Sequence, residues 1–171
     1  MRGQKDNPVK TEKAIGILLR EKRWTLSIAE SCTGGLVSDL ITNVAGSSDY
    51  FEGGIISYSN LAKTEHLGVP PDSIRKHGAV SSVVAISMAE GVRKAFHTSF
   101  GVSITGIAGP GGGSRKKPVG LVFIAVSDGK KTFVKKETLK GTRREIKKES
   151  ARRSLKSLHD FIMKTISAAD R

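Results

Sequence analysis

The stretch Leu26-Ser27-Ile28-Ala29-Glu30-Ser31-Cys32-Thr33-Gly34-Gly35-Leu36 joins a short apolar run to a helical pattern. A strand that turns directly into a helix exposes its turn residues and leaves backbone N–H groups unpaired at the helix N-terminus. This turn carries three side chains that can act as nucleophiles (Ser31, Cys32 and Thr33), followed by two glycines. It therefore suits either the binding of an anion or an attack on a carbonyl.

Strand and helix patterns alternate on both sides of this turn. Helical spacing predicts helices over residues 11–22, 35–44, 61–67, 81–96 and 143–167, with at most a helical turn at 72–76. Strands are expected over residues 24–29, 53–59, 100–105, 119–126 and 132–139. Asp128-Gly129 joins the last two strands as a hairpin, which is incompatible with a purely parallel sheet. We expect one α/β domain with a mixed sheet covered by helices on both faces.

The composition of the chain limits its class. A chain of 171 residues fits one domain with a substantial core, and it holds no apolar run of the roughly 20 residues that a membrane span needs. The first residues are polar and lack the apolar segment of a signal peptide. The single cysteine, Cys32, excludes an internal disulfide and a multi-cysteine metal site. A soluble cytoplasmic protein is therefore expected.

The positive charge of the chain is concentrated in one segment. The net charge is +13, and residues 115–156 carry fifteen Lys and Arg against four acids. Such a segment could be a nucleic-acid or polyphosphate surface, or the solvated face of a hairpin and a helix. Nucleic-acid modules usually place exposed aromatic rings among the basic residues, whereas Phe123 and Phe133 fall in predicted strands. The solvated face is the favoured interpretation.

Three polar or glycine-rich segments follow predicted strand ends, at residues 31–35, 58–63 and 105–113. Ligands collect outside the carboxyl ends of strands in open α/β sheets, so these segments could line one cleft. Taken singly, each residue has a simpler role. Ser31 and Thr33 could cap a helix, Cys32 and Tyr58 could be buried, and Lys63 could be solvated.

Taken together, these residues favour chemistry. A serine hydroxyl needs a base, and a lysine with a lowered pKa can serve, so Lys63 could activate Ser31. Tyr58 could relay or hold the proton, and Thr105 could orient the lysine or the substrate. Backbone N–H groups of Thr33, Gly34 and Gly35 could form an oxyanion hole. No histidine lies in these turns, so a Ser-His-Asp triad is not favoured.

The segment 106–113 is a second glycine-rich loop. It lacks the Gly-Lys-Ser/Thr end of a Walker phosphate loop, and no helix clearly follows it as in a Rossmann fingerprint. An ATPase or a dinucleotide oxidoreductase is therefore disfavoured. Its backbone amides could still cradle a single phosphate.

A series of short motifs resembles the CinA C-terminal domain family, in the expected order over residues 12 to 166. These motifs occupy residues 29–35, 51–54, 58–60 with Lys63, 67–69, 78–81, 88–91, 105–110 and 118–120. The resemblance implies the activity of a nicotinamide-nucleotide amidohydrolase. Such enzymes convert nicotinamide mononucleotide and water to nicotinate mononucleotide and ammonia in pyridine-nucleotide recycling. The resemblance implies a single-domain three-layer α/β/α sandwich without metal or cofactor, formed by residues 11–168 behind a polar tail at 1–10.

The resemblance also assigns roles to residues. Ser31 matches the nucleophile and Lys63 the base, with Tyr58 and Thr105 as supporting polar residues. It implies the stand-alone form of a domain that is often fused behind a larger one, and a homo-oligomer.

Substrate contacts are expected at two places. Thr33, Gly34 and Gly35 would form the oxyanion hole, and the ribose phosphate would be held by Gly106, Gly109, Gly111 and Arg143. The chain reads Gly141-Thr142-Arg143 where the family often has Gly-Asp-Arg. Thr142 can still cap the following helix, in a capping box with Glu145, but either Arg143 or Arg144 could enter the site.

Two alternatives stay open. One is a non-catalytic nucleotide- or nucleic-acid-binding module related to competence or DNA damage, with the basic segment as its contact surface. The other is an amidohydrolase that acts on another small amide.

Overall fold

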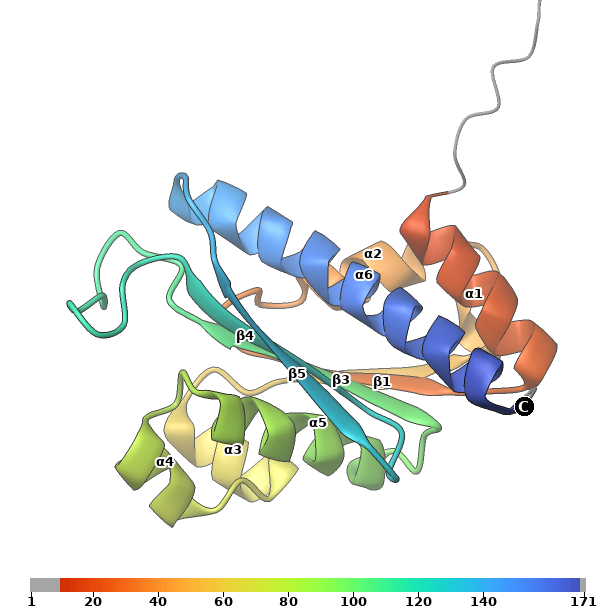
Figure 1. Ribbon diagram of the computed structural model, residues 1–171, viewed down its shortest axis with the longest axis horizontal. Coiled ribbons are helices and arrows are strands. Elements are labelled where there is room, and N and C mark those ends of the chain that lie inside the picture. Colours follow the sequence, from red (N-terminus) through yellow and green to blue (C-terminus); the bar gives the residue numbers. More distant parts are fainter. Residues whose placement is uncertain (1–9, 170–171) are drawn as a thin grey trace, which may run out of the picture.

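The computed structural model describes residues 10–169, which fold around one five-stranded sheet (Figure 1). The strand order is β2-β1-β3-β4-β5. The strands are β1 Leu26–Glu30, β2 Phe51–Ile56, β3 Phe100–Gly106, β4 Leu121–Ser127 and β5 Thr132–Thr138. β1 pairs in parallel with β2 and β3, whereas β3–β4 and β4–β5 are antiparallel. The predicted mixed sheet and its hairpin are confirmed.

Helices cover both faces of the sheet, which gives the three-layer α/β/α sandwich (Figure 1). On one face lie α1 Thr11–Lys22, α2 Leu36–Thr42 and α6 Arg143–Ala169. On the other lie α3 Asn60–Leu67, α4 Pro71–His77 and α5 Ser82–Ala95, and a short 3-10 turn, η1 Ser47–Asp49, precedes β2. None of the described helices combines the length and the apolar character needed to cross a membrane.

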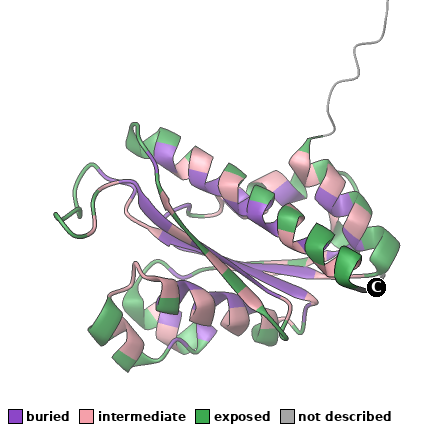
Figure 2. Ribbon diagram, viewed as in Figure 1, coloured by how far each residue is buried: buried purple, intermediate pink, exposed green. Residues whose placement is uncertain are grey.

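The central strands form the core because helices cover both of their faces. All five residues of β1 are buried, as are most of β3 and β4 (Figure 2). Strands buried on both faces read as nearly continuous apolar runs, which is how β4 stands out in the sequence. One apolar cluster joins the sheet to α1, α2 and α6, and a second joins it to α3 and α5.

The bounds of several elements differ from the prediction by one to three residues, and two of these differences have a clear local cause. α4 is a helix of seven residues rather than a single turn, because Pro71 starts it, Asp72 lies in its first turn and basic residues lie in its last. β2 ends at Ile56 rather than at Ser59, because Ser59 accepts a hydrogen bond from Ala62 N and caps α3. Apart from Lys10, the predicted tail at 1–10 lies outside the described residues, and the domain boundary stays a prediction.

Candidate active site

A buried lysine lies against the serine of the turn after β1. Lys63 Nζ donates to Ser31 Oγ at 3.0 Å and to the Ser57 carbonyl oxygen at 2.5 Å. Lys63 is 1% exposed and Ser31 8%. Burial lowers the pKa of Lys63 below its ordinary value of 10.5, because desolvation penalises the ammonium form. The structure thus brings together the two residues for which the sequence predicted the roles of nucleophile and base.

Parallel strands bring this pair together. Ser31 N donates to the Ile104 carbonyl of β3 at 3.0 Å, and Ser57 N donates to the Glu30 carbonyl of β1 at 2.8 Å. The turns after β1 and β2 therefore both start at the carboxyl ends of parallel strands, on the same side of the sheet. The chain then enters α3, whose first turn directs Lys63 back under β1.

Glu30 holds the other side of the turn. Its carboxylate is buried and accepts the N–H groups of Gly35 at 2.9 Å, Val37 at 3.2 Å and Ser38 at 2.9 Å. Ser38 Oγ donates to it as well, at 2.8 Å. The carboxylate thus caps α2 from the end of β1, where the helix dipole favours a negative charge.

This cap corrects the predicted oxyanion hole. The N–H of Gly35 is already paired with Glu30, so Gly35 does not supply a free donor. Within residues 10–169, no acceptor is found for the N–H groups of Thr33 and Gly34. The geometry therefore leaves the N–H groups of Thr33 and Gly34, without that of Gly35, as donors for an oxyanion hole.

Cys32 and Thr33 complete the turn with buried side chains. Cys32 is 6% exposed, and burial raises the pKa of its thiol to about 11, so it is not ionised at neutral pH. Thr33 is fully buried, and its hydroxyl has no hydrogen-bond partner among the described residues. Of these three side chains, Ser31 is the one that shares a hydrogen bond with Lys63 among the described residues.

Arg143 connects two other predicted site residues. Its Nη1 donates to the Gly109 carbonyl at 2.5 Å and its Nη2 to the Tyr58 hydroxyl at 3.0 Å. The structure therefore places Arg143, rather than Arg144, in contact with these segments. Tyr58 is 63% exposed, so its ring is not buried. Its hydroxyl accepts from Arg143 instead of lying beside Lys63 as a proton relay would.

The helix start at Arg143 has the predicted cap. Thr142 N and Oγ1 both lie 2.8 Å from Glu145 Oε2, and Glu145 N donates back to Thr142 Oγ1 at 3.4 Å. These bonds to its carboxylate lower the pKa of Glu145. The capping box fixes the first turn of α6 and thereby the backbone from which Arg143 extends.

Thr105 and the glycines of the second loop have distinct surroundings. Thr105 Oγ1 donates to the Ala79 carbonyl at 2.9 Å, so it anchors the segment before α5, and the described part of the chain has no hydrogen bond between Thr105 and Lys63. A side chain at Gly106 would stand 3.1 Å from Cys32 Sγ, so this glycine permits close packing under the turn. Gly111 is exposed, with open space beside it.

Two lysines near the site were not found from the sequence. Lys147 Nζ lies 3.5 Å from where a side chain at Gly34 would begin, and Lys117 Nζ donates to the carbonyls of His77 at 2.6 Å and Val80 at 2.7 Å. Lys147 follows Arg143 by four residues and shares its helix face, which was the available signal. No group of three or more His, Cys, Asp or Glu gathers as a metal site within the described part of the chain.

These features define a class of protein: a three-layer α/β protein with a serine, at a strand-to-helix turn, beside a buried lysine. The model of the CinA C-terminal domain family matches residues 9–162, and the chain belongs to this family.

Named relatives agree with this assignment. The chain is 48% identical over 152 residues to a CinA-like protein of Syntrophus aciditrophicus (strain SB), covering 88% of this chain and 36% of the relative. It is 49% identical over 144 residues to a putative competence-damage inducible protein of Moorella thermoacetica, covering 84% and 35%. The chain thus spans about a third of the length of these curated relatives.

Solved structures match over nearly their whole chains. The competence/damage inducible protein CihA from Agrobacterium tumefaciens has a TM-score of 0.83 at 37% identity, with 91% of this chain and 97% of that chain covered. The competence damage-inducible protein A from Klebsiella pneumoniae subsp. pneumoniae has a TM-score of 0.85 at 26% identity, with 88% and 93% covered.

Proposed function

We propose that this protein hydrolyses the carboxamide of nicotinamide mononucleotide to nicotinate mononucleotide and ammonia. The observation that carries the proposal is the 3.0 Å contact between Lys63 Nζ and Ser31 Oγ, in surroundings that lower the pKa of Lys63. A buried lysine with a lowered pKa can be neutral and so can accept the serine proton. Membership in the CinA C-terminal domain family supports the choice of substrate.

In the proposed reaction, Ser31 Oγ attacks the carboxamide carbon while neutral Lys63 takes its proton. The oxyanion of the tetrahedral intermediate accepts hydrogen bonds from the amides of Thr33 and Gly34. When the C–N bond breaks, the ammonium of Lys63 returns the proton to the leaving nitrogen, which departs as ammonia. Water, deprotonated by Lys63, then attacks the ester on Ser31 and releases the carboxylate and the free serine.

The nucleotide phosphate would be held by the cations that face this turn. Lys147 Nζ lies beside Gly34, and Arg143 lies one helical turn earlier on the same face of α6. Arg143 also bonds the carbonyl of Gly109 in the glycine-rich loop, which places its charge at that loop. Binding the phosphate accelerates the reaction only by positioning the carboxamide at Ser31.

The test is ammonia release from nicotinamide mononucleotide by the purified chain, by Ser31→Ala and by Lys63→Met. Each substitution is expected to lower kcat by about 10³-fold or more, because nucleophile and base act as a unit. Ser73→Ala and Lys76→Met on α4 are matched controls and should retain full activity. Absence of ammonia release by the unmodified chain would reject the function, and full activity of Ser31→Ala would reject the mechanism.

A second substrate separates this reaction from the hydrolysis of other small amides. Nicotinamide riboside lacks the phosphate, so its kcat/KM should be lower by about 100-fold or more if two cations hold that group. Arg143→Ala and Lys147→Ala should reduce the difference in kcat/KM between nicotinamide mononucleotide and nicotinamide riboside. Equal kcat/KM for both substrates would show that the phosphate is not recognised.

A further inference from the structure

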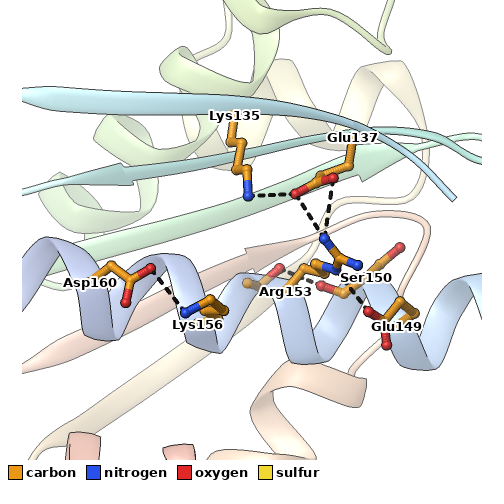
Figure 3. Close-up of polar contacts among 8 residues, drawn as sticks. Lys135, Glu137, Glu149, Ser150, Arg153, Lys156 and Asp160 are labelled. Carbon is orange, nitrogen blue, oxygen red and sulfur yellow. Dashed lines mark hydrogen bonds and ion pairs between the residues drawn. The ribbon is translucent and has the colours of Figure 1, made fainter.

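A groove of about 620 Å³ lies between β5 and the C-terminal half of α6. No residue that lines it belongs to the Ser31 site. Figure 3 shows part of this region, with Lys135 and Glu137 on the strand opposite Arg153, Lys156 and Asp160 on the helix. The groove is therefore a feature that the proposed hydrolysis does not use.

The groove exists because β5 is covered on only one face. Its residues alternate between the two faces of the sheet. Val134 packs against the α5 cluster of Ala85 and Ala89, whereas Phe133 lines the groove and is 39% exposed. α6 packs over β3 and β4 instead, so the α6 side of the edge strand stays open.

The groove combines positive charge with apolar rings. Two acids line it, Asp128 and Asp160, against six bases: Lys130, Lys131, Lys135, Arg153, Lys156 and Lys164. Carboxylates of the chain offset part of this charge, since Glu137 accepts from Lys135 at 2.7 Å and Arg153 binds Glu149 at 2.8 Å. The rings are Phe133, with Lys164 Nζ at 5.9 Å from its centroid, and Phe161.

The outer edge of β5 presents backbone groups for pairing. Asp128 N bonds Lys131 O at one end of the hairpin, and Leu139 N bonds Gly120 O at the other. Antiparallel pairs alternate, so the odd-numbered residues of β5 exchange bonds with β4. The N–H and C=O groups of the even-numbered residues, such as Val134 and Lys136, therefore point away from the sheet.

We propose that this groove binds an acidic, extended segment of a partner protein, which adds to β5 as a sixth strand. Its backbone would pair with the even-numbered residues of β5, and its carboxylates would face the basic lining. Its apolar side chains would pack on Phe133 and Phe161. Charge complementarity selects this occupant over a second copy, because a second copy would bring the same predominantly basic lining to this groove, in a chain of net charge +13.

The first test uses a fluorescein-labelled eight-residue peptide, Glu-Thr-Val-Thr-Glu-Thr-Val-Thr, whose Glu and Val side chains lie on the same face of an extended strand. The same peptide with Lys in place of Glu is its control. Fluorescence anisotropy should show saturable binding of the Glu peptide alone, weakened about tenfold or more between 50 and 300 mM salt. The variant Lys131→Glu/Lys164→Glu should bind at least about tenfold more weakly. Lys76→Glu/Lys94→Glu, on α4 and α5, makes the same change in net charge and should bind within about twofold of the unmodified chain.

A second test addresses the pairing itself. Hydrogen exchange at the amides of Val134 and Lys136 should slow when the Glu peptide is bound, while the amides of Phe133 and Lys135 stay as they are. Equal binding by the two double variants, or no change in exchange on β5, would overturn the proposal. So would an eight-residue oligothymidylate that binds more tightly than the peptide and is weakened by Lys131→Glu/Lys164→Glu, since the groove would then serve a nucleic acid.

Discussion

At the scale of single residues, the burial of Lys63 determines its strength as a base in the proposed reaction. Desolvation lowers its pKa from 10.5, and only the neutral amine can accept the proton of Ser31. The kcat/KM for nicotinamide mononucleotide should therefore rise tenfold per pH unit below this pKa and reach a plateau before pH 10.5. A pH–rate profile measures this directly. A profile that still rises at pH 10.5 would contradict the role of Lys63.

Cys32 is the thiol next to Ser31, and burial keeps it protonated. With a pKa of about 11, far less than 1% of the thiol is ionised at pH 8, compared with roughly a quarter of an ordinary cysteine. Iodoacetamide should alkylate Cys32 about 100-fold more slowly than it alkylates glutathione at the same pH. Mass spectrometry measures both rates. Cys32→Ala should retain most of the amidase activity. Rapid alkylation that abolishes activity would instead assign the nucleophile to Cys32.

At the scale of elements, the Glu30 carboxylate joins β1 to α2. Glu30→Gln keeps the shape of the side chain but replaces one carboxylate oxygen with an NH2 group. This donor would face the N–H groups of Gly35, Val37 or Ser38, which need an acceptor. The free energy of unfolding should fall by roughly 1–3 kcal/mol in urea titrations, and kcat should fall more than KM rises. Glu52→Gln, on an exposed position of β2, is the control. An unchanged kcat would mean that the turn holds its shape without this cap.

The sequence predicted elements more completely than contacts. Periodicity placed the residues of α1 and α5 and the hairpin correctly, because their apolar faces are long and regular. Strand ends at Ser31 and before Lys63 were enough to predict that these residues meet. The pairing of Gly35 with Glu30, and of Arg143 with Tyr58, depends on side-chain directions that spacing does not fix. Lys147 was missed because its four-residue spacing from Arg143 does not set it apart from the many other basic residues of α6.

At the scale of the whole molecule, the candidate site draws on both helical layers. Lys63 comes from α3 on one face of the sheet, whereas Arg143 and Lys147 come from α6 on the other (Figure 1). Ser31 lies between them, at the end of β1. Because Lys63 belongs to α3 and Ser31 follows β1, the distance between Lys63 Nζ and Ser31 Oγ depends on how closely α3 packs beneath β1.

The packing of α3 depends on Gly91 in α5. A side chain at this position would overlap the Leu67 carbonyl, at the end of the helix that carries Lys63. Gly91→Ala should therefore lower the free energy of unfolding by about 1–3 kcal/mol, although alanine favours helices by about 1 kcal/mol. It should also lower kcat by up to about 100-fold, because α3 has to shift and Lys63 moves away from Ser31.

Urea unfolding and ammonia release, measured on the same preparations, separate these two effects. Gly111→Ala is the control for stability, since its new methyl group would enter open space and should change the free energy of unfolding by less than about 0.5 kcal/mol. If Gly91→Ala loses stability but keeps full kcat, α3 moves without carrying Lys63 out of reach of Ser31. If it keeps both its stability and its kcat, the contact between α3 and α5 has room for a methyl group. The position of Lys63 is then set by its hydrogen bond to the Ser57 carbonyl instead.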